Sequence, residues 1–226
     1  MMHSKKLILA LDGRPWNEFT PILEKLRNTE VIFKINDLIL EKDISALIST
    51  LHEYGEVMVD LKWHDIPKTV RNYSMRVRTH SPWAVTVHAS GGFEMIKTLA
   101  DTLKGIKILA VTLLTSLDKT DSIAIYQEEP LEQVKKLATL AIEAGAHGLV
   151  CSPHEVSFLR KLYPSTILVT PGVRLEAHTS EKGRTATPRE AIIAGANYIV
   201  MGRDIIEAEN PIKTVEKVLG ELSGKT

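Results

Sequence analysis

The sequence predicts a (β/α)8 barrel, on three observations. Short apolar runs rich in β-branched residues alternate with segments of helical length and period, eight times over 226 residues. Near-continuous apolar strands joined by helices indicate parallel strands that are buried on both faces. Polar residues recur where the strands end, and no G-x-G-x-x-G follows the first strand, as a dinucleotide-binding open sheet would usually show. These features favour a closed barrel, near the small end of its size range, over a doubly wound sheet.

The expected strands are apolar runs of five to seven residues. In order they are KLILAL (6–11), VIFKI (31–35), EVMVDL (56–61), WAVTVH (83–88), KILAVTL (107–113), GLVCS (148–152), TILVTP (166–171) and NYIVMG (197–202). The helical patterns cover 15–28, 41–54, 67–80, 92–104, 131–144, 153–162, 188–195 and 204–220. Two long loops, 113–130 and 171–187, follow the fifth and seventh strands, on the face where barrel enzymes place their sites. Because no linker or low-complexity tract interrupts the pattern, we expect one domain over 1–226.

Charge and cysteine content narrow the class of protein. The chain has 28 basic and 28 acidic residues, a formal net charge of +0, and no basic cluster interleaved with aromatic residues. We therefore expect neither nucleic acid nor a membrane surface as a partner. The one cysteine, Cys151, lies in an apolar run and is expected to be a packing residue in a reducing compartment. With no apolar stretch long enough for a signal peptide core or a membrane span, the expected location is cytoplasmic.

Charged residues gather at the ends of the first three strands. Asp60 and Lys62 point the same way because side chains alternate along a strand. Asp12 ends the first strand, Lys34 lies on the second, and Asp65 follows the third. Any one of them alone would suit a helix cap or a solvated position. Together, carboxylates and ammonium groups of alternating sign can hold one another ionised at one rim, so we predict a functional charge network.

The segment DLKWHDIPKTV, residues 60–70, closely resembles the D-L-K-x-x-D-I-P-x-T-V signature of orotidine 5′-phosphate decarboxylases. Shorter segments agree with that family in chain order. They are LALD at 9–12, FKI at 33–35, VHASGG at 87–92, VTLLTS at 111–116, VTPGVR at 169–174 and MGR at 201–203. The resemblance extends over roughly residues 6–215, which is nearly the whole chain.

The resemblance implies decarboxylation of orotidine 5′-monophosphate to UMP, the last step of de novo pyrimidine nucleotide synthesis, without metal ion or cofactor. Lys62 would stabilise the carbanion at C6 and then deliver a proton to it. Asp60 would lie near the departing carboxylate. Lys34 would hold Asp60 ionised and contact the ribose, and Asp12 would bind the ribose hydroxyls.

The same resemblance implies a homodimer with shared active sites, in which Asp65, Ile66 and Thr69 complete the site of the neighbouring subunit. Asp65 and Thr69 also suit the start of a helix at Pro67, and the two interpretations are compatible. Thr115 corresponds to the family position that meets the pyrimidine edge. Taken alone, Thr115 would be interpreted as an ordinary loop hydroxyl.

Phosphate binding is expected at the loops after the seventh and eighth strands. Gly202 and Arg203 open the last helix, where backbone amides and a guanidinium can hold an anion. Pro171 and Arg174 keep their places in the seventh turn of the family pattern. Binding energy from the phosphate can help close the 171–187 loop over the site.

The chain departs from the family pattern in two places. Asn36 stands where the family usually has glycine, and asparagine tolerates a left-handed backbone better than most residues. The seventh loop, PGVRLEAHTSEKGRTATP, lacks the family's D-Q-x-R segment, whose glutamine contacts phosphate. His178, Lys182 and Arg184 are the candidates to supply that contact.

Two other functions are compatible with parts of the sequence. Related barrels share D-x-K-x-x-D but decarboxylate or condense sugar phosphates with Mg²⁺, and they carry an acid at the place of Lys34. A catalytically inactive nucleotide-binding barrel would explain the altered seventh loop and Asn36. The histidines show no metal-binding spacing, and neither His64 nor His88 is assigned a chemical role.

Overall fold

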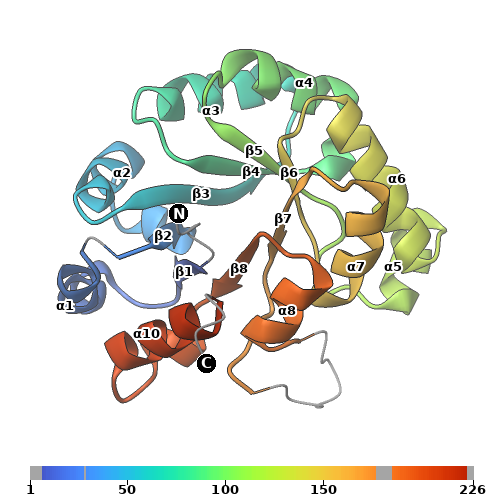
Figure 1. Cartoon of the computed structure of the whole chain (residues 1–226). Coiled ribbons are helices and arrows are strands. Elements are labelled where there is room, and N and C mark those ends of the chain that lie inside the picture. Colours follow the sequence, from blue (N-terminus) through green and yellow to red (C-terminus); the bar gives the residue numbers. More distant parts are fainter. Residues whose placement is uncertain (1–6, 28, 177–184, 223–226) are drawn as a thin grey trace.

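The structure is a computed structural model that describes residues 7–27, 29–176 and 185–222. Its strands form a closed barrel in the order β1 to β8, each parallel to the next, and β8 pairs with β1. The helices surround the strands on the outside (Figure 1). The predicted (β/α)8 barrel is therefore confirmed, and the open doubly wound sheet is excluded.

The strands lie within a few residues of the predicted runs. They are β1 Leu7–Leu11, β2 Val31–Ile35, β3 Glu56–Trp63, β4 Ala84–His88, β5 Lys107–Val111, β6 Gly148–Val150, β7 Ile167–Thr170 and β8 Tyr198–Met201. The main difference is in β3, which continues to Trp63 and so includes the segment that carries Lys62.

Helices connect the strands at the periphery. They are α1 Trp16–Leu26, α2 Ile44–His52, α3 Pro67–Arg78, α4 Phe93–Thr102, α5 Lys119–Tyr126, α6 Pro130–Glu143, α7 Pro153–Leu162, α8 Pro188–Ala194, α9 Arg203–Ile206 and α10 Pro211–Leu222, with 3-10 turns η1 Asp37–Leu40 and η2 Ala89–Gly91. Five of these helices, α3, α6, α7, α8 and α10, begin at a proline. Proline suits this position because the first amide of a helix has no intrahelical acceptor.

Three sequence-based expectations need correction. The segment 113–130 is not a plain loop, because α5 lies within it, capped by reciprocal hydrogen bonds between Asp118 and Asp121. Apolar periodicity does not predict this helix, because Ile123 and Ile125 are exposed and form no apolar stripe. The predicted 204–220 helix is divided into α9 and α10. The predicted 41–54 helix begins only at Ile44, where the Asp43 carboxylate accepts two backbone amides.

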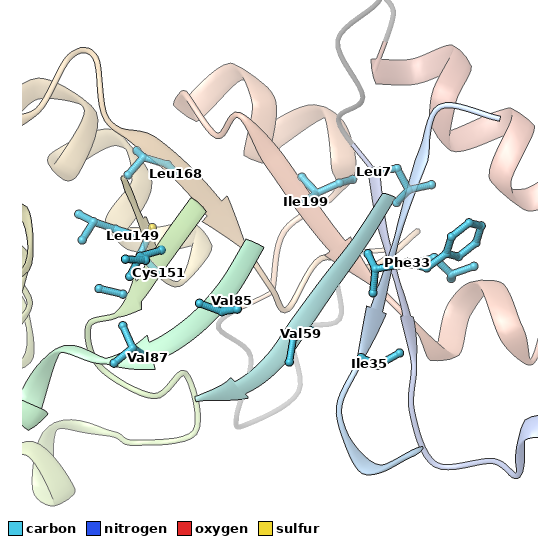
Figure 2. Packing of buried hydrophobic residues seen from close by; sticks show 14 of the residues in the cluster. Leu7, Phe33, Ile35, Val59, Val85, Val87, Leu149, Cys151, Leu168 and Ile199 are labelled. Atoms are coloured by element: carbon cyan, nitrogen blue, oxygen red, sulfur yellow. The ribbon is translucent and has the colours of Figure 1, made fainter. Parts of the chain in front are cut away.

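Alternation along the strands divides the core into two layers. Leu7, Leu9 and Leu11 belong to the large cluster shared by strands and helices, whereas Ile8 and Ala10 belong to a second cluster formed by residues of the strands and their edges, inside the barrel. Figure 2 shows members of the first cluster on several strands. Inward positions near the carboxyl ends of the strands are thus the ones that can carry polar groups.

Cys151 is confirmed as a packing residue. Its side chain is 1% exposed and lies in the cluster between strands and helices (Figure 2). Burial raises the pKa of the thiol far above its usual range, so the group stays protonated and unreactive. Among the described residues, none of the helices has the length and apolar character needed to cross a membrane.

Candidate active site

A cavity of about 630 Å³ opens at the carboxyl ends of the strands. It is lined by the ends of β1, β2, β3 and β8 and by the loops that follow β5 and β7. The predicted site residues in its lining are Asp12, Lys34, Asp60, Lys62, Thr115, Pro171, Arg174, Gly202 and Arg203. The structure therefore brings most of the predicted site together on the expected face of the barrel.

The register of the first three strands places the charges beside one another. Lys34 is level with Ala10 on β1 and with Met58 on β3. Asp12 and Asp60 lie two residues beyond those partners, so they share the inward face with Lys34. The charge network is therefore a direct consequence of parallel pairing in this register.

The four side chains form a chain of alternating charge. The Lys34 Nζ atom lies 2.6 Å from Oδ2 of Asp12 and 3.2 Å from Oδ2 of Asp60. The Lys62 Nζ atom lies 2.9 Å from the same Oδ2 atom of Asp60. The Lys34 and Asp60 side chains are only 6% and 10% exposed, whereas Lys62 is 30% exposed and borders the cavity. Lys62 is thus the ammonium of this network that is open to a ligand.

The protonation of Lys34 follows from its neighbours. Burial by itself lowers the pKa of an ammonium group, but the carboxylates of Asp60 and Asp12 outweigh it, and the pKa of Lys34 is raised. Lys34 therefore remains a cation at neutral pH and stabilises both carboxylates.

Two residues that the sequence did not single out also belong to the site. Thr86, on β4, is 1% exposed, and its hydroxyl donates a 2.8 Å hydrogen bond to Oδ1 of Asp60. Arg14 follows β1 and lines the cavity, with a long 3.4 Å contact to Glu18. A polar residue at an inward position of an apolar strand was the available signal for Thr86. For Arg14 the signal was a cation two residues after a strand-end aspartate.

The two arginines expected to hold phosphate differ in their surroundings. Nη1 of Arg174 lies 2.5 Å from Oδ1 of Asp204, whose Oδ2 accepts the Leu175 amide at 2.8 Å. The ion pair of Arg174 with Asp204 thus helps to fix the start of the seventh loop. Arg203 lines the cavity, and its guanidinium has no hydrogen bond or ion pair with the described part of the chain. The candidates His178, Lys182 and Arg184 lie outside the described residues.

Three predicted residues do not line this cavity. They are Asp65, Ile66 and Thr69. The Asp65 carboxylate accepts the Ile66 amide at 2.7 Å and the Tyr73 hydroxyl at 3.2 Å, while the Ile66 side chain is 64% exposed. Burial and the Asp65 carboxylate raise the pKa of Tyr73, so its hydroxyl stays a donor to Asp65. Within one chain these residues form a separate exposed surface at the start of α3.

Asn36 has φ −134°, so this turn does not need the left-handed backbone that we expected at that position.

The ring of half-buried His88 lies 5.4 Å from that of His64, and burial, His64 and Lys62 lower the pKa of His88. In the described part of the chain, no group of three or more His, Cys, Asp or Glu side chains is placed to hold a metal ion.

Comparison with known proteins decides the family. The model of the Orotidine 5'-phosphate decarboxylase / HUMPS family matches residues 5–218. The chain belongs to this family. It is 37% identical to the orotidine 5'-phosphate decarboxylase of Chromohalobacter salexigens over 228 residues, which cover 96% of this chain and 97% of that protein. It is 36% identical to the enzyme of the same name from Coxiella burnetii, over 94% of each chain.

A solved structure supports the same assignment. The crystal structure of orotidine 5'-phosphate decarboxylase from Lactobacillus acidophilus is similar with a TM-score of 0.83 and 34% identity, over 96% of this chain and 98% of that one. Members of the orotidine 5'-phosphate decarboxylase family thus share both sequence and barrel with this chain along its length, and the resemblance found in the motif at 60–70 is confirmed.

Proposed function

We propose that this protein decarboxylates orotidine 5′-monophosphate to UMP and CO₂ without metal ion or cofactor, with Lys62 as the proton donor. The observation that carries the proposal is the chain of alternating charges Asp12, Lys34, Asp60 and Lys62 in the lining of the cavity, in which Lys34 and Asp60 are buried. Buried charges are costly, so a network of this kind favours a catalytic role over passive binding.

In the proposed reaction the bond between C6 and the carboxylate carbon breaks, and its electron pair stays on C6. The Lys62 ammonium stabilises this carbanion and transfers a proton from Nζ to C6, after which solvent reprotonates the amine. Asp60 lies 2.9 Å from Lys62 and would face the substrate carboxylate before CO₂ leaves. The step needs no oxidant or reductant, and the positive charge of Lys62 stabilises the negative charge of the carbanion.

The remaining groups of the cavity are proposed to bind the nucleotide. Asp12 and Lys34 would contact the ribose hydroxyls, and Thr115 would meet the pyrimidine edge. The phosphate would lie where β1 and β8 are neighbours, between Arg14 and the turn of Gly202 and Arg203. The guanidinium of Arg203, which has no ion pair or hydrogen bond with the described residues, is available to a dianion. Pro171 and Arg174 would shape the adjoining wall.

Lys34 also argues against magnesium chemistry. A cation at this place, held charged by two carboxylates, would repel Mg²⁺ and already occupies the acidic oxygens that would bind it. This supports cofactor-free decarboxylation over a magnesium-dependent sugar-phosphate reaction in the same barrel.

We further propose that the protein is a homodimer with shared sites. Asp65, Ile66 and Thr69 lie outside the cavity of their own chain, and Ile66 exposes an apolar side chain beside the Asp65 carboxylate. Exposed apolar groups next to a positioned acid suit an interface. In the dimer these residues would reach the cavity of the partner.

The test is an ultraviolet assay of chelator-treated protein with orotidine 5′-monophosphate, comparing the parent with Lys62→Ala and with Lys135→Ala, an exposed lysine on α6. We expect turnover in the parent and in Lys135→Ala, and a loss of at least about a thousandfold in Lys62→Ala. A parent that binds UMP but does not turn over would instead indicate the inactive nucleotide-binding barrel. Turnover only after Mg²⁺ is added would contradict the cofactor-free reaction.

A further inference from the structure

The third strand is irregular next to the charge network. Val59 pairs with Val85, but the next pair is Trp63 with Val87, so four residue steps on β3 match two steps on β4. Two extra residues are therefore accommodated within the segment that carries Asp60 and Lys62. Bulges of this kind redirect side chains and disrupt the backbone hydrogen bonds of the ladder.

Lys62 takes the unusual backbone conformation that this bulge requires. Its φ is 46°, in the left-handed region, which residues other than glycine and asparagine rarely adopt. Such a conformation persists only where surrounding contacts hold it. The backbone of the proposed proton donor is thus strained and needs external support.

Thr86 provides that support from the neighbouring strand β4. It is the single residue between Val85 and Val87, directly across from the bulge. Its Oγ1 accepts a hydrogen bond from the Lys62 amide at 2.9 Å. A threonine hydroxyl has one proton, which Thr86 directs to Oδ1 of Asp60 at 2.8 Å. One buried hydroxyl therefore contacts both the backbone of Lys62 and the carboxylate of Asp60.

The same contact determines how Asp60 is oriented. Its Oδ2 atom is shared by Lys34 and Lys62, whereas Thr86 provides the one donor to Oδ1 within the described residues. With both oxygens held, the carboxylate cannot rotate about its terminal bond without losing a partner. The direction of Asp60 toward the cavity thus depends on Thr86.

We propose that Thr86 is a positioning residue of the decarboxylation site, which holds the strained Lys62 backbone and the Asp60 carboxylate in their reactive arrangement. The inference rests on the proposed function, in which Lys62 and Asp60 act on the substrate. Thr86 itself does not line the cavity, so it would act through Lys62 and Asp60 and not by contact with the substrate.

The experiment compares Thr86→Val, Thr86→Ser and Thr112→Val. Valine keeps the shape and strand propensity of threonine but removes the hydroxyl, and serine restores the hydroxyl. Thr112 is a matched control because it is equally buried, at 2% exposure, and its hydroxyl donates to the Val150 carbonyl on the neighbouring strand. Steady-state kinetics, thermal unfolding and calorimetric titration with UMP would be measured for each variant. The titration gives the fraction of sites that bind nucleotide, so that kcat can be calculated per binding-competent site.

We expect Thr86→Val to lose about 10- to 100-fold in kcat with KM within about threefold of the parent, because the positioned groups act mainly in the transition state. Thr86→Ser should recover kcat to within about threefold, and Thr112→Val should stay within about twofold. A Thr86→Val protein with parental kcat, or a Thr86→Ser protein as impaired as Thr86→Val, would overturn the inference.

A crystal structure of Thr86→Val provides a readout that does not depend on activity. We expect the Lys62 backbone or the Asp60 carboxylate to leave its parental position. Unchanged positions of both groups would refute the positioning role, even if kcat were altered. An inactive parent protein, by contrast, would refute the proposed function while this structural result still tested the role of Thr86.

Discussion

The Lys34 ammonium lies 3.2 Å from the Asp60 carboxylate, and their side chains are only 6% and 10% exposed. Because these two charges are poorly solvated, each is stabilised mainly by its ion-pair partners. We therefore expect Lys34→Met to destabilise the fold. Breaking a buried pair from one side costs about 3–5 kcal/mol, and the retained Lys62 contact should place the loss near the lower end, at about 3 kcal/mol. Urea unfolding measures this change.

The control for this prediction is the double variant Lys34→Met with Asp60→Asn, which removes both charges. It should recover part of the lost stability because the buried carboxylate that lost its Lys34 partner is no longer charged. A Lys34→Met protein as stable as the parent would show that Asp60 does not need this partner.

Arg14 is expected to contribute to binding of the phosphate end of the nucleotide. It lines the cavity, and its 3.4 Å contact to Glu18 is long and partly exposed, so the guanidinium is available to an anion. We predict that Arg14→Gln raises KM for orotidine 5′-monophosphate about tenfold and changes kcat by less than about threefold.

Arg189→Gln, an exposed arginine on α8, is the matched control and should leave both constants near the parental values. The increase in KM should also shrink at high salt, because the lost contact is electrostatic. If Arg14→Gln and Arg189→Gln behave alike, Arg14 does not contact the substrate.

Asp65 provides a direct test of shared active sites. If each site combines Lys62 of one chain with Asp65 of the other, a heterodimer of Lys62→Ala and Asp65→Asn contains one intact site and one doubly altered site. Co-expression of the two inactive variants should then restore about one quarter of the parental activity by random pairing. Each variant alone should remain inactive. Absence of restoration in an isolated heterodimer would mean that Asp65 acts within its own chain or not at all.

Stability should fall as the pH is lowered through the range in which histidine titrates. Burial lowers the pKa of His88 and of His147 from 6.5, and Nδ1 of His147 accepts the Ile108 amide at 3.2 Å, which requires an unprotonated nitrogen. Just below pH 6.5 the unfolded chain therefore binds more protons than the folded one, so stability declines with decreasing pH.

Thermal unfolding between about pH 7.5 and 5.5 measures this effect, because carboxylates with lowered pKa, such as Asp101, act only at lower pH. His147→Gln should flatten the pH dependence. His154→Gln, an exposed histidine on α7, should leave it unchanged. A parent protein whose melting temperature does not vary over this range would contradict the prediction.

Much of the candidate site could be predicted because it depends on regular alternation. Asp12, Lys34 and Asp60 occupy inward positions at strand ends. Parallel pairing brings such positions together independently of the conformation of the loops. The helix α5 could not be predicted in the same way, because its exposed isoleucines form no apolar stripe. A local pattern reveals only those elements whose burial is periodic.

The sequence by itself determined the barrel and the rim at which the charges meet, and its resemblance to the family indicated Lys62 as the proposed proton donor. Only the tertiary structure decided that Thr86 lies across from the bulge at Lys62 and that Asp204 holds Arg174. Each of these relationships joins residues more than 20 positions apart, through an irregular backbone or a side-chain rotamer. Periodicity carries no information about such contacts, because they depend on how separate strands and loops are placed against one another.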